Sequence, residues 1–501
     1  MNLLQRKDFY LIAFLYLVVI LIFFPLFYTE YVYTDEAVQL WNYRPGSGFN
    51  MFAIQGRWVT EQLIGRSFDA ANSISDITYI RIFSLAMWLV FIPVWYIVMK
   101  RVTANGAGYE YLPLLTCLYL VTSLPFAISI QWASCLELAI SNTAGLISGA
   151  ILYIAIRDND KWLQVPIGAA LGALVAGFIS LSAYQSSFAC FLIPFLFHYI
   201  SAYTTQKDKV LIKGLAFCFF MYAFYFLTFK IYLAINHIPG DARTGISFNV
   251  IKKLAFFVAR PLKKAFEFNV IVNIDGNLSR IVCVLLFGGW VLLAFNRFGK
   301  KNRIGAVKYL AAANLIFLVS YTPSLLVKEN YASNRTLFAI DMCVWVVCAE
   351  MVLYVLKKET LRKAAGYGIA VFLIFFGWYN FNRQFLMPIR EEYNDVRNYV
   401  FQHYNSNITT VYFIQPGEDA FQKKYHLQSS MDEFGVPSTF FIWVPEPFIR
   451  LLVLEKTGSR ETAGNLTIKW WDSEESFKAS GEQVNGNTLI VNVPQILFSG
   501  K

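Results

Sequence analysis

The feature that most constrains this chain is a series of apolar runs, each long enough to cross a lipid bilayer. They lie near residues 9–28, 79–99, 111–130, 139–156, 164–183, 186–203, 214–235, 278–295, 307–327, 336–356 and 364–384. About 20 apolar residues suffice for one helical crossing. Only 15% of the 501 residues are charged, against about 25% in soluble proteins. The sequence therefore predicts a polytopic α-helical membrane protein with about eleven spans.

The distribution of lysine and arginine predicts how these spans are oriented. Basic residues gather in alternate loops, at 6–7, 100–101, 157–161, 207–213, 297–303 and 357–363. Such loops stay in the cytoplasm. We therefore expect a cytoplasmic N-terminus and outer loops at 29–78, 131–138, 183–186, 236–277 and 328–335. The basic residues of the loop 236–277 do not change this, because long loops are translocated despite their charge.

The last part of the chain differs in character from the rest. Strand-like runs lie at 410–415, 438–444, 466–471 and 488–493, each bounded by Gly, Pro or Asn. We expect residues 385–501 to form a small α/β domain outside the membrane. Residues 1–384 form the transmembrane domain in this prediction.

The first outer loop, 29–78, contains the densest group of polar residues. Asp35 and Glu36 follow the first span almost directly. Further along the loop, apolar side chains recur at helical spacing, at Phe49, Phe52, Gly56, Val59 and Leu63. This spacing predicts an amphipathic helix that lies on the outer membrane surface.

Asp35 has two interpretations at this stage. A carboxylate at the mouth of a lipid-lined cavity can act as a general base, and Arg57 can bind a lipid phosphate with two parallel hydrogen bonds. Alternatively, Asp35 and Glu36 cap the next helix, and Arg57 pairs with Glu61 one turn away.

The outer segment 250–266 is basic and amphipathic. Lys253, Arg260 and Lys264 share one side of its helical wheel. These side chains either bind the phosphate of a lipid substrate or hold the segment against anionic headgroups.

Several polar residues fall at or near the outer ends of the spans. They are Glu137, Tyr184, Gln185, Lys328, Arg335 and Asp341. Ionisable groups at membrane depth are costly and therefore suggest function. Arg335 can instead extend its side chain to the interface, and Asp341 can pair with another helix.

Other features exclude some classes of function. The seven cysteines lie in or beside apolar runs without zinc spacing, which indicates a role in packing. The net charge of +10 favours anionic lipid or phosphate partners. Nucleic acid is not expected, because no basic cluster interleaved with aromatic residues lies on a soluble module.

Four short motifs resemble the multi-span membrane glycosyltransferases of the GT-C fold. They are Asp35-Glu36 after the first span, Gly56-Arg57-Trp58, Tyr184-Gln185, and Asn334-Arg335 before a late span. More specifically, the chain is similar to the serotype-converting glucosyltransferases that modify bacterial O-antigen. The resemblance covers the layout of the whole chain. It implies a GT-C-like fold in the bacterial inner membrane.

The resemblance also implies a reaction and roles for residues. A glucose-like hexose would pass from a polyprenyl phosphate to a hydroxyl of a cell-surface glycan on the outer side. Asp35 would act as the base. The acidic pairs of this family are often two aspartates, whereas this chain has Asp-Glu, so Glu36 is the alternative base. The donor phosphate would bind Arg57, Arg260, Lys264 and Arg335. The other substrate-binding candidates are Trp41, Arg66, Glu137, Tyr184, Gln185 and Lys328.

We expect no cofactor and do not favour a divalent metal, since members that use lipid-phosphate sugars often need none. Membrane lipids are further partners. Two other functions remain as alternatives, namely a transporter or flippase of lipid-linked sugars and a glycan polymerase. The inner halves of the predicted spans carry almost no charge, which disfavours transport.

Overall fold

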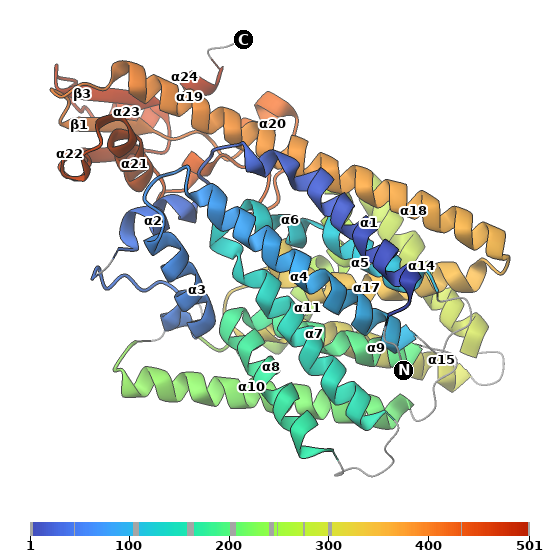
Figure 1. The fold of residues 1–501 in the computed structure, drawn as a ribbon. Coiled ribbons are helices and arrows are strands. Elements are labelled where there is room, and N and C mark those ends of the chain that lie inside the picture. Colours follow the sequence, from blue (N-terminus) through green and yellow to red (C-terminus); the bar gives the residue numbers. More distant parts are fainter. Residues whose placement is uncertain are drawn as a thin grey trace.

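The computed structural model describes residues 4–44, 46–103, 110–157, 165–200, 207–239, 245–247, 249–273, 276–298, 303–431 and 433–498. Parts of the predicted cytoplasmic loops, at 158–161, 201–206 and 299–302, lie outside these ranges. The structure has a helical membrane part, α1 to α18, and a C-terminal part that contains a small sheet at one end of the molecule (Figure 1).

The membrane part is built from helices of very different length. Its α-helices are α1 (Arg6–Phe23), α2 (Asp35–Asn42), α3 (Trp58–Asp69), α4 (Ile77–Thr103), α5 (Leu112–Thr122), α6 (Leu124–Gln131), α7 (Glu137–Ile156), α8 (Ile167–Ala183), α9 (Ile193–Ile200), α10 (Lys207–Ile235), α11 (Val250–Phe257), α12 (Lys263–Phe266), α13 (Asn269–Val272), α14 (Asn277–Phe298), α15 (Arg303–Val319), α16 (Thr322–Leu326), α17 (Asn334–Val355) and α18 (Glu359–Tyr379). Short 3₁₀-helical stretches cover Phe24–Phe27, Ala53–Gln55, Ala133–Cys135 and Gln185–Leu192, and a π-helical stretch covers Val258–Leu262.

Seven helices among the described residues are long and apolar enough to cross a membrane, or up to eight if the bent pair α5–α6 is one span. This agrees with the predicted polytopic membrane protein. The number of about eleven spans is not confirmed. The described parts of the predicted runs 164–183 and 186–203 lie in shorter apolar helices, Ile167–Ala183 and Gln185–Ile200. The two helices are separated at Tyr184, whose backbone is extended, with φ −149° and ψ 111°.

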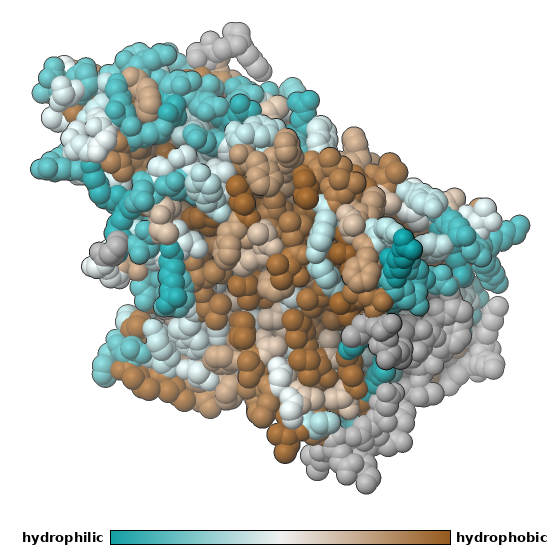
Figure 2. All heavy atoms as spheres, viewed as in Figure 1, coloured by the Kyte–Doolittle hydropathy of each residue, from teal (hydrophilic) through white to brown (hydrophobic). Residues whose placement is uncertain are grey.

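The helices α7 and α17 form the centre of the membrane part. In their most apolar stretches, 72% and 83% of the residues are buried, against 22% in α14. Figure 2 shows apolar side chains gathered over the helices and hydrophilic ones over the C-terminal part. Residues at the first turns of α7 and α17 are therefore placed deep in the molecule rather than at its surface.

A continuous helix joins the two parts of the chain. After α18, a π-helical stretch (Asn380–Leu386) leads without a break into α19 (Met387–His403). The predicted domain boundary at residues 384 and 385 lies inside this stretch. The division of the chain at this point stays a prediction.

The C-terminal part, α19 to α24, contains a three-stranded parallel sheet in the order β2-β1-β3. The strands are β1 (Thr410–Ile414), β2 (Thr467–Trp471) and β3 (Thr488–Asn492), and Thr410 lies opposite Thr467 and Thr488. The remaining helices are α20 (Ala420–Tyr425), α21 (Pro445–Thr457), α22 (Arg460–Gly464), α23 (Glu474–Ala479) and α24 (Val493–Phe498). The described tail thus has the predicted α/β character.

Two local predictions are wrong. The run 438–444 contains a 3₁₀ turn, Ser438–Phe440, and no strand, because prolines at 437 and 445 flank it and lack a backbone N–H for a ladder. The helix of the first loop begins at Trp58 rather than near Phe49, since Gly56 has φ 80° and interrupts the helical path. The helix α3 then packs against α7 and α8.

Candidate active site

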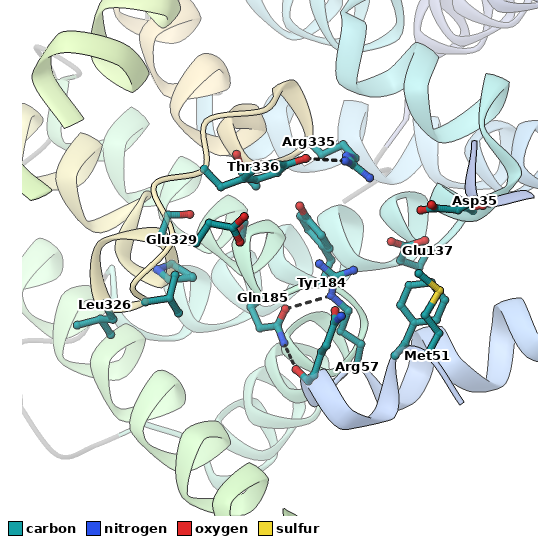
Figure 3. Close-up of a pocket in the computed structure, with 18 of the residues that line it drawn as sticks. Asp35, Met51, Arg57, Glu137, Tyr184, Gln185, Leu326, Glu329, Arg335 and Thr336 are labelled. Atoms are coloured by element: carbon teal, nitrogen blue, oxygen red, sulfur yellow. Dashed lines mark hydrogen bonds between the residues drawn. The ribbon is translucent and has the colours of Figure 1, made fainter. Parts of the chain in front are cut away.

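A cavity of about 1200 Å³ lies between the membrane part and the C-terminal part (Figure 3). Six of the predicted site residues line it, namely Asp35, Arg57, Glu137, Tyr184, Gln185 and Arg335. Another wall is apolar and comes from α10, with Phe219, Tyr222, Ala223, Tyr225, Phe226 and Phe229. The C-terminal part contributes Glu418, Met431, Val436, Phe440, Phe441 and Trp443. The cavity therefore combines a polar end with a long aromatic wall.

Asp35 is the first residue of α2 and is partly exposed in the cavity. The residue before it, Thr34, has φ 42° and ψ −114°, a conformation that favours glycine and is rare for a β-branched residue. The Thr34 N–H donates a hydrogen bond of 2.8 Å to the Ser438 hydroxyl. The C-terminal part therefore helps to hold the backbone that presents Asp35.

The segment that carries Ser438 is itself anchored on α19. The backbone N–H groups of Ser438 and Thr439 donate to the buried carboxylate of Glu392 at 2.8 and 3.0 Å. The side chain of Gln415 donates to the backbone carbonyls of Thr439 and Phe440. A connected set of hydrogen bonds thus runs from α19 and β1 to the residue before Asp35.

Glu36 points away from the cavity. Its carboxylate is fully buried, forms an ion pair with Arg81 at 2.5 Å, and accepts the N–H groups of Tyr33 and Ala133 at 2.7 and 2.6 Å. Burial raises the pKa of Glu36, and Arg81 and the two N–H groups oppose that rise. Of the two neighbouring carboxylates, the structure therefore places only Asp35 in the cavity.

Arg57 lies across the polar end of the cavity from Asp35, just before α3 (Figure 3). Its guanidinium stacks 4.4 Å over the ring of Tyr184, and its Nε donates to Gln185 at 3.4 Å. The Gln185 amide donates to the Gln55 carbonyl and the Tyr225 hydroxyl at 2.9 and 2.8 Å. Burial raises the pKa of Tyr184 to about 12, so its hydroxyl stays neutral.

Gly56 allows this arrangement to be compact. A Cβ atom at this position would lie 2.3 Å from the hydroxyl oxygen of Tyr225, which donates to the Gly56 carbonyl at 3.0 Å. The predicted alternative partner of Arg57, Glu61, instead accepts the N–H of Phe52 and the hydroxyl of Tyr43. The structure does not show an ion pair between Arg57 and Glu61 among the contacts it describes.

Arg335 lies in the first turn of α17 and is held from several sides. Its Nε donates to Glu433 at 2.8 Å, and its guanidinium lies 4.5 Å over the ring of Trp132. The Glu433 carboxylate also accepts the backbone N–H groups of Asn334 and Arg335, at 2.8 and 3.2 Å, at the N-terminus of α17. Arg335 is therefore partly buried and held in a network of contacts.

The structure does not bring the other predicted residues into the cavity. Trp41 lies under the guanidinium of Arg460, at 3.9 Å, in the C-terminal part. The side chains of Arg66, Arg260 and Lys328 are exposed, and that of Lys264 is half-buried. Within the described ranges, neither these five residues nor Glu36 line the cavity.

Some residues support the site from a distance. Lys253, which the sequence places on a basic face with Arg260 and Lys264, is buried instead, and its Nζ donates to the carbonyls of Ser324, Lys328 and Glu329, at 3.3, 3.3 and 2.9 Å. This holds a turn that lines the cavity. For Ser438 and Glu433 the only signal in the sequence was their place in a proline- and glycine-containing stretch of the tail.

The described residues contain no group of three or more His, Cys, Asp or Glu side chains placed to hold a metal ion. The positive charge that faces the polar end of the cavity comes from Arg57 and Arg335.

Comparison with known proteins assigns the family. None of the curated proteins searched matches the chain. A family model described as glucosyl transferase GtrII matches residues 24–356, which include α2, α3, α7, α10 and α17. All six predicted residues that line the cavity fall within this match. The chain therefore belongs to the glucosyl transferase GtrII family.

Proposed function

We propose that this protein transfers glucose from a polyprenyl phosphate to a hydroxyl of a cell-surface glycan, the O-antigen, on the outer side of the bacterial inner membrane. The observation that carries the proposal is a single cavity in which Asp35, Arg57 and Arg335 share a polar end beside an aromatic wall. The family supplies the sugar and the type of reaction.

The aromatic wall of α10 suits the polyprenyl chain of the donor. The inner side chains of α10 line the cavity, while Phe220, Leu227 and Ile231 on the same helix are exposed on its outer surface. A helix with apolar side chains all round contacts lipid and cavity at the same time. The prenyl chain can therefore lie along α10 with its phosphate toward Arg57, whose planar fork matches phosphate oxygens.

The reaction follows from the placement of charges. Asp35 takes the proton of the acceptor hydroxyl, and the acceptor oxygen forms a bond to the anomeric carbon of glucose. The bond between that carbon and the phosphate oxygen breaks, and the polyprenyl phosphate leaves with the electron pair. Arg57 and Arg335 stabilise the negative charge that develops on the leaving phosphate. No divalent metal takes part in this proposal.

The acceptor glycan approaches from the C-terminal part. Phe440, Phe441 and Trp443 line the cavity there, and Trp443 is 44% exposed. Phe441 and Trp443 lie stacked, with ring centroids 5.0 Å apart. Flat aromatic faces with a polar rim suit the apolar faces of sugar rings. This part of the cavity accordingly holds the acceptor while the α10 side holds the donor.

A reconstituted transfer assay tests the proposal. The purified protein in lipid nanodiscs would receive polyprenyl-phosphate glucose or UDP-glucose, with an O-antigen oligosaccharide as acceptor. We expect single glucose additions from the polyprenyl donor alone, release of polyprenyl phosphate, and an unchanged rate in EDTA. Use of UDP-glucose alone would refute the donor assignment. Transport of the donor in proteoliposomes without transfer, or the growth of long chains, would refute the assignment as a glucose-adding transferase in favour of a transporter or a polymerase.

A further inference from the structure

Glu137 is a buried carboxylate whose position is not explained by the structure around it. It is the first residue of the central helix α7, is 2% exposed, and lines the cavity. Its Oε2 atom has no hydrogen-bond partner among the residues that the structure describes. A buried polar atom without a hydrogen-bond partner costs folding free energy, and the cost is larger for an atom of a charged group than for one of a neutral group.

The other buried glutamates near the cavity do have partners. Glu36 binds Arg81 and two backbone N–H groups, Glu392 binds Ser438 and Thr439, and Glu433 binds Arg335. These three side chains hold elements together. Glu137 differs from them because it lines the cavity while its buried Oε2 atom has no hydrogen-bond partner among the described residues.

The surroundings of Glu137 indicate which ligand would complete its hydrogen bonds. Arg57 and Arg335 both lie within electrostatic range of it. Their described hydrogen bonds include those to Gln185 from Arg57, and to Glu433, Tyr331 and Cys135 from Arg335. A carboxylate accepts hydrogen bonds and donates none. A sugar hydroxyl fits this point better than a phosphate does, because it can donate to the carboxylate and brings no second negative charge.

The place of Glu137 in the cavity selects one of the two sugars. In Figure 3 its carboxylate is drawn beside Asp35, with Arg57 on the other side. In the proposed reaction Asp35 touches the acceptor hydroxyl and Arg57 the donor phosphate. The group that lies between a base and a leaving phosphate is the transferred hexose.

We propose that Glu137 accepts a hydrogen bond from a hydroxyl of the transferred hexose and so selects the donor sugar. This inference rests on the proposed function, because it assumes a donor with a phosphate-linked hexose. The hydroxyl replaces the missing partner of Oε2 when the donor binds. An analogue without that hydroxyl leaves the buried oxygen unpaired, and such sites reject their analogues strongly.

Glu137 also lies at the N-terminus of α7, where a negative charge stabilises a helix. A residue with that role alone would change the stability of the protein but not its choice of sugar. The experiment must therefore compare ligands that differ only in the sugar, on a protein whose folding is checked independently.

The test measures the affinity of the full-length protein in nanodiscs for polyprenyl phosphate, polyprenyl-phosphate glucose and the monodeoxyglucose forms of that donor. The variants are Glu137→Gln and Glu137→Ala. The matched control is Glu461→Gln, an exposed carboxylate that also lies in the first turn of a helix, α22, and does not line the cavity.

We expect both Glu137 variants to bind polyprenyl phosphate as the wild type does, which shows that the site is folded. Their affinity for the glucose donor should fall roughly tenfold for Glu137→Gln and roughly 10- to 100-fold for Glu137→Ala. The wild type should bind one of the monodeoxyglucose donors more weakly than it binds the glucose donor. Glu137→Ala should bind that monodeoxy donor and the glucose donor with the same low affinity. The control should bind all donors normally.

Two results would overturn the inference while leaving the proposed function intact. The Glu137 variants could bind the glucose donor as tightly as the wild type does, or they could lose glucose donor and bare polyprenyl phosphate by the same factor. If the wild-type protein bound neither polyprenyl ligand, the proposed function itself would be refuted, and the role of Glu137 with it.

Discussion

The hydrogen bond from Thr34 to Ser438 offers a way to perturb Asp35 without touching the cavity lining on the donor side. The N–H to Oγ distance is 2.8 Å, and both residues are buried. Replacing Ser438 by alanine leaves a buried N–H without a partner, at about 1–3 kcal/mol. The φ of 42° at Thr34 stores about 1–3 kcal/mol of strain that only its surroundings maintain.

In Ser438→Ala we therefore expect the backbone at Thr34 to relax and to move the Asp35 carboxylate. A loss of about 1–3 kcal/mol in the transition state lowers kcat roughly 5- to 150-fold. The affinity for polyprenyl-phosphate glucose should stay unchanged, because Arg57 keeps its contacts with Tyr184 and Gln185.

A second substitution separates strain from other effects. Glycine adopts this conformation without strain, so Thr34→Gly in the Ser438→Ala background should recover most of the lost rate. The assay compares kcat, donor affinity and melting temperature in the wild type, the two single variants and the double variant. If Ser438→Ala turned over like the wild type, or if glycine restored nothing, the argument from backbone strain would be refuted.

The remaining predictions concern the donor site and its support. Arg57→Ala should weaken binding of polyprenyl phosphate and its glucose form alike, roughly 10- to 100-fold in titrations; an effect on the glucose form alone would contradict this. Glu36→Gln leaves Arg81 buried without its partner and should cost about 3–5 kcal/mol, seen as a lower melting temperature; an unchanged one would contradict the pairing. Gly56→Ala places a Cβ against Tyr225 at a positive φ, and should lower both melting temperature and donor affinity. Wild-type values of both would contradict the requirement for glycine at this position.

The apolar runs predicted the helical membrane part well, because burial in lipid needs continuous apolar helices whatever the tertiary contacts are. Asp35 and Tyr184 were predicted as site residues because each follows an apolar run, and the end of that run determines how deep in the membrane the residue lies. Glu36 could not be separated from Asp35 in this way. The turn at Thr34 decides which of the two faces the cavity, and that turn depends on Ser438, about four hundred residues away.

The basic segment shows where helical periodicity misleads. Arg260 and Lys264 share a side with Lys253 only if the helix is regular. The π-helical stretch Val258–Leu262 inserts an extra residue into one turn and rotates the residues after it. Lys253 consequently holds a turn of the cavity wall, while Arg260 is exposed.

The prediction of a strand at 438–444 was wrong for a related reason. Its apolar side chains, Phe440, Phe441 and Trp443, line the cavity. An apolar run of this length indicates burial or contact with a ligand, and its periodicity does not tell a strand from a turn that faces a cavity.

The central claim is that Asp35 is the base of a glucosyl transfer reaction, and Asp35→Asn tests it most directly. The measurements are single-turnover glucose transfer and the affinity for polyprenyl-phosphate glucose, with Asp69→Asn as a control on the same loop, where the aspartate is exposed. We predict that Asp35→Asn binds the donor normally and loses at least about 100-fold in transfer rate, while the control keeps its rate. Transfer by Asp35→Asn at the rate of the wild type would contradict the assignment.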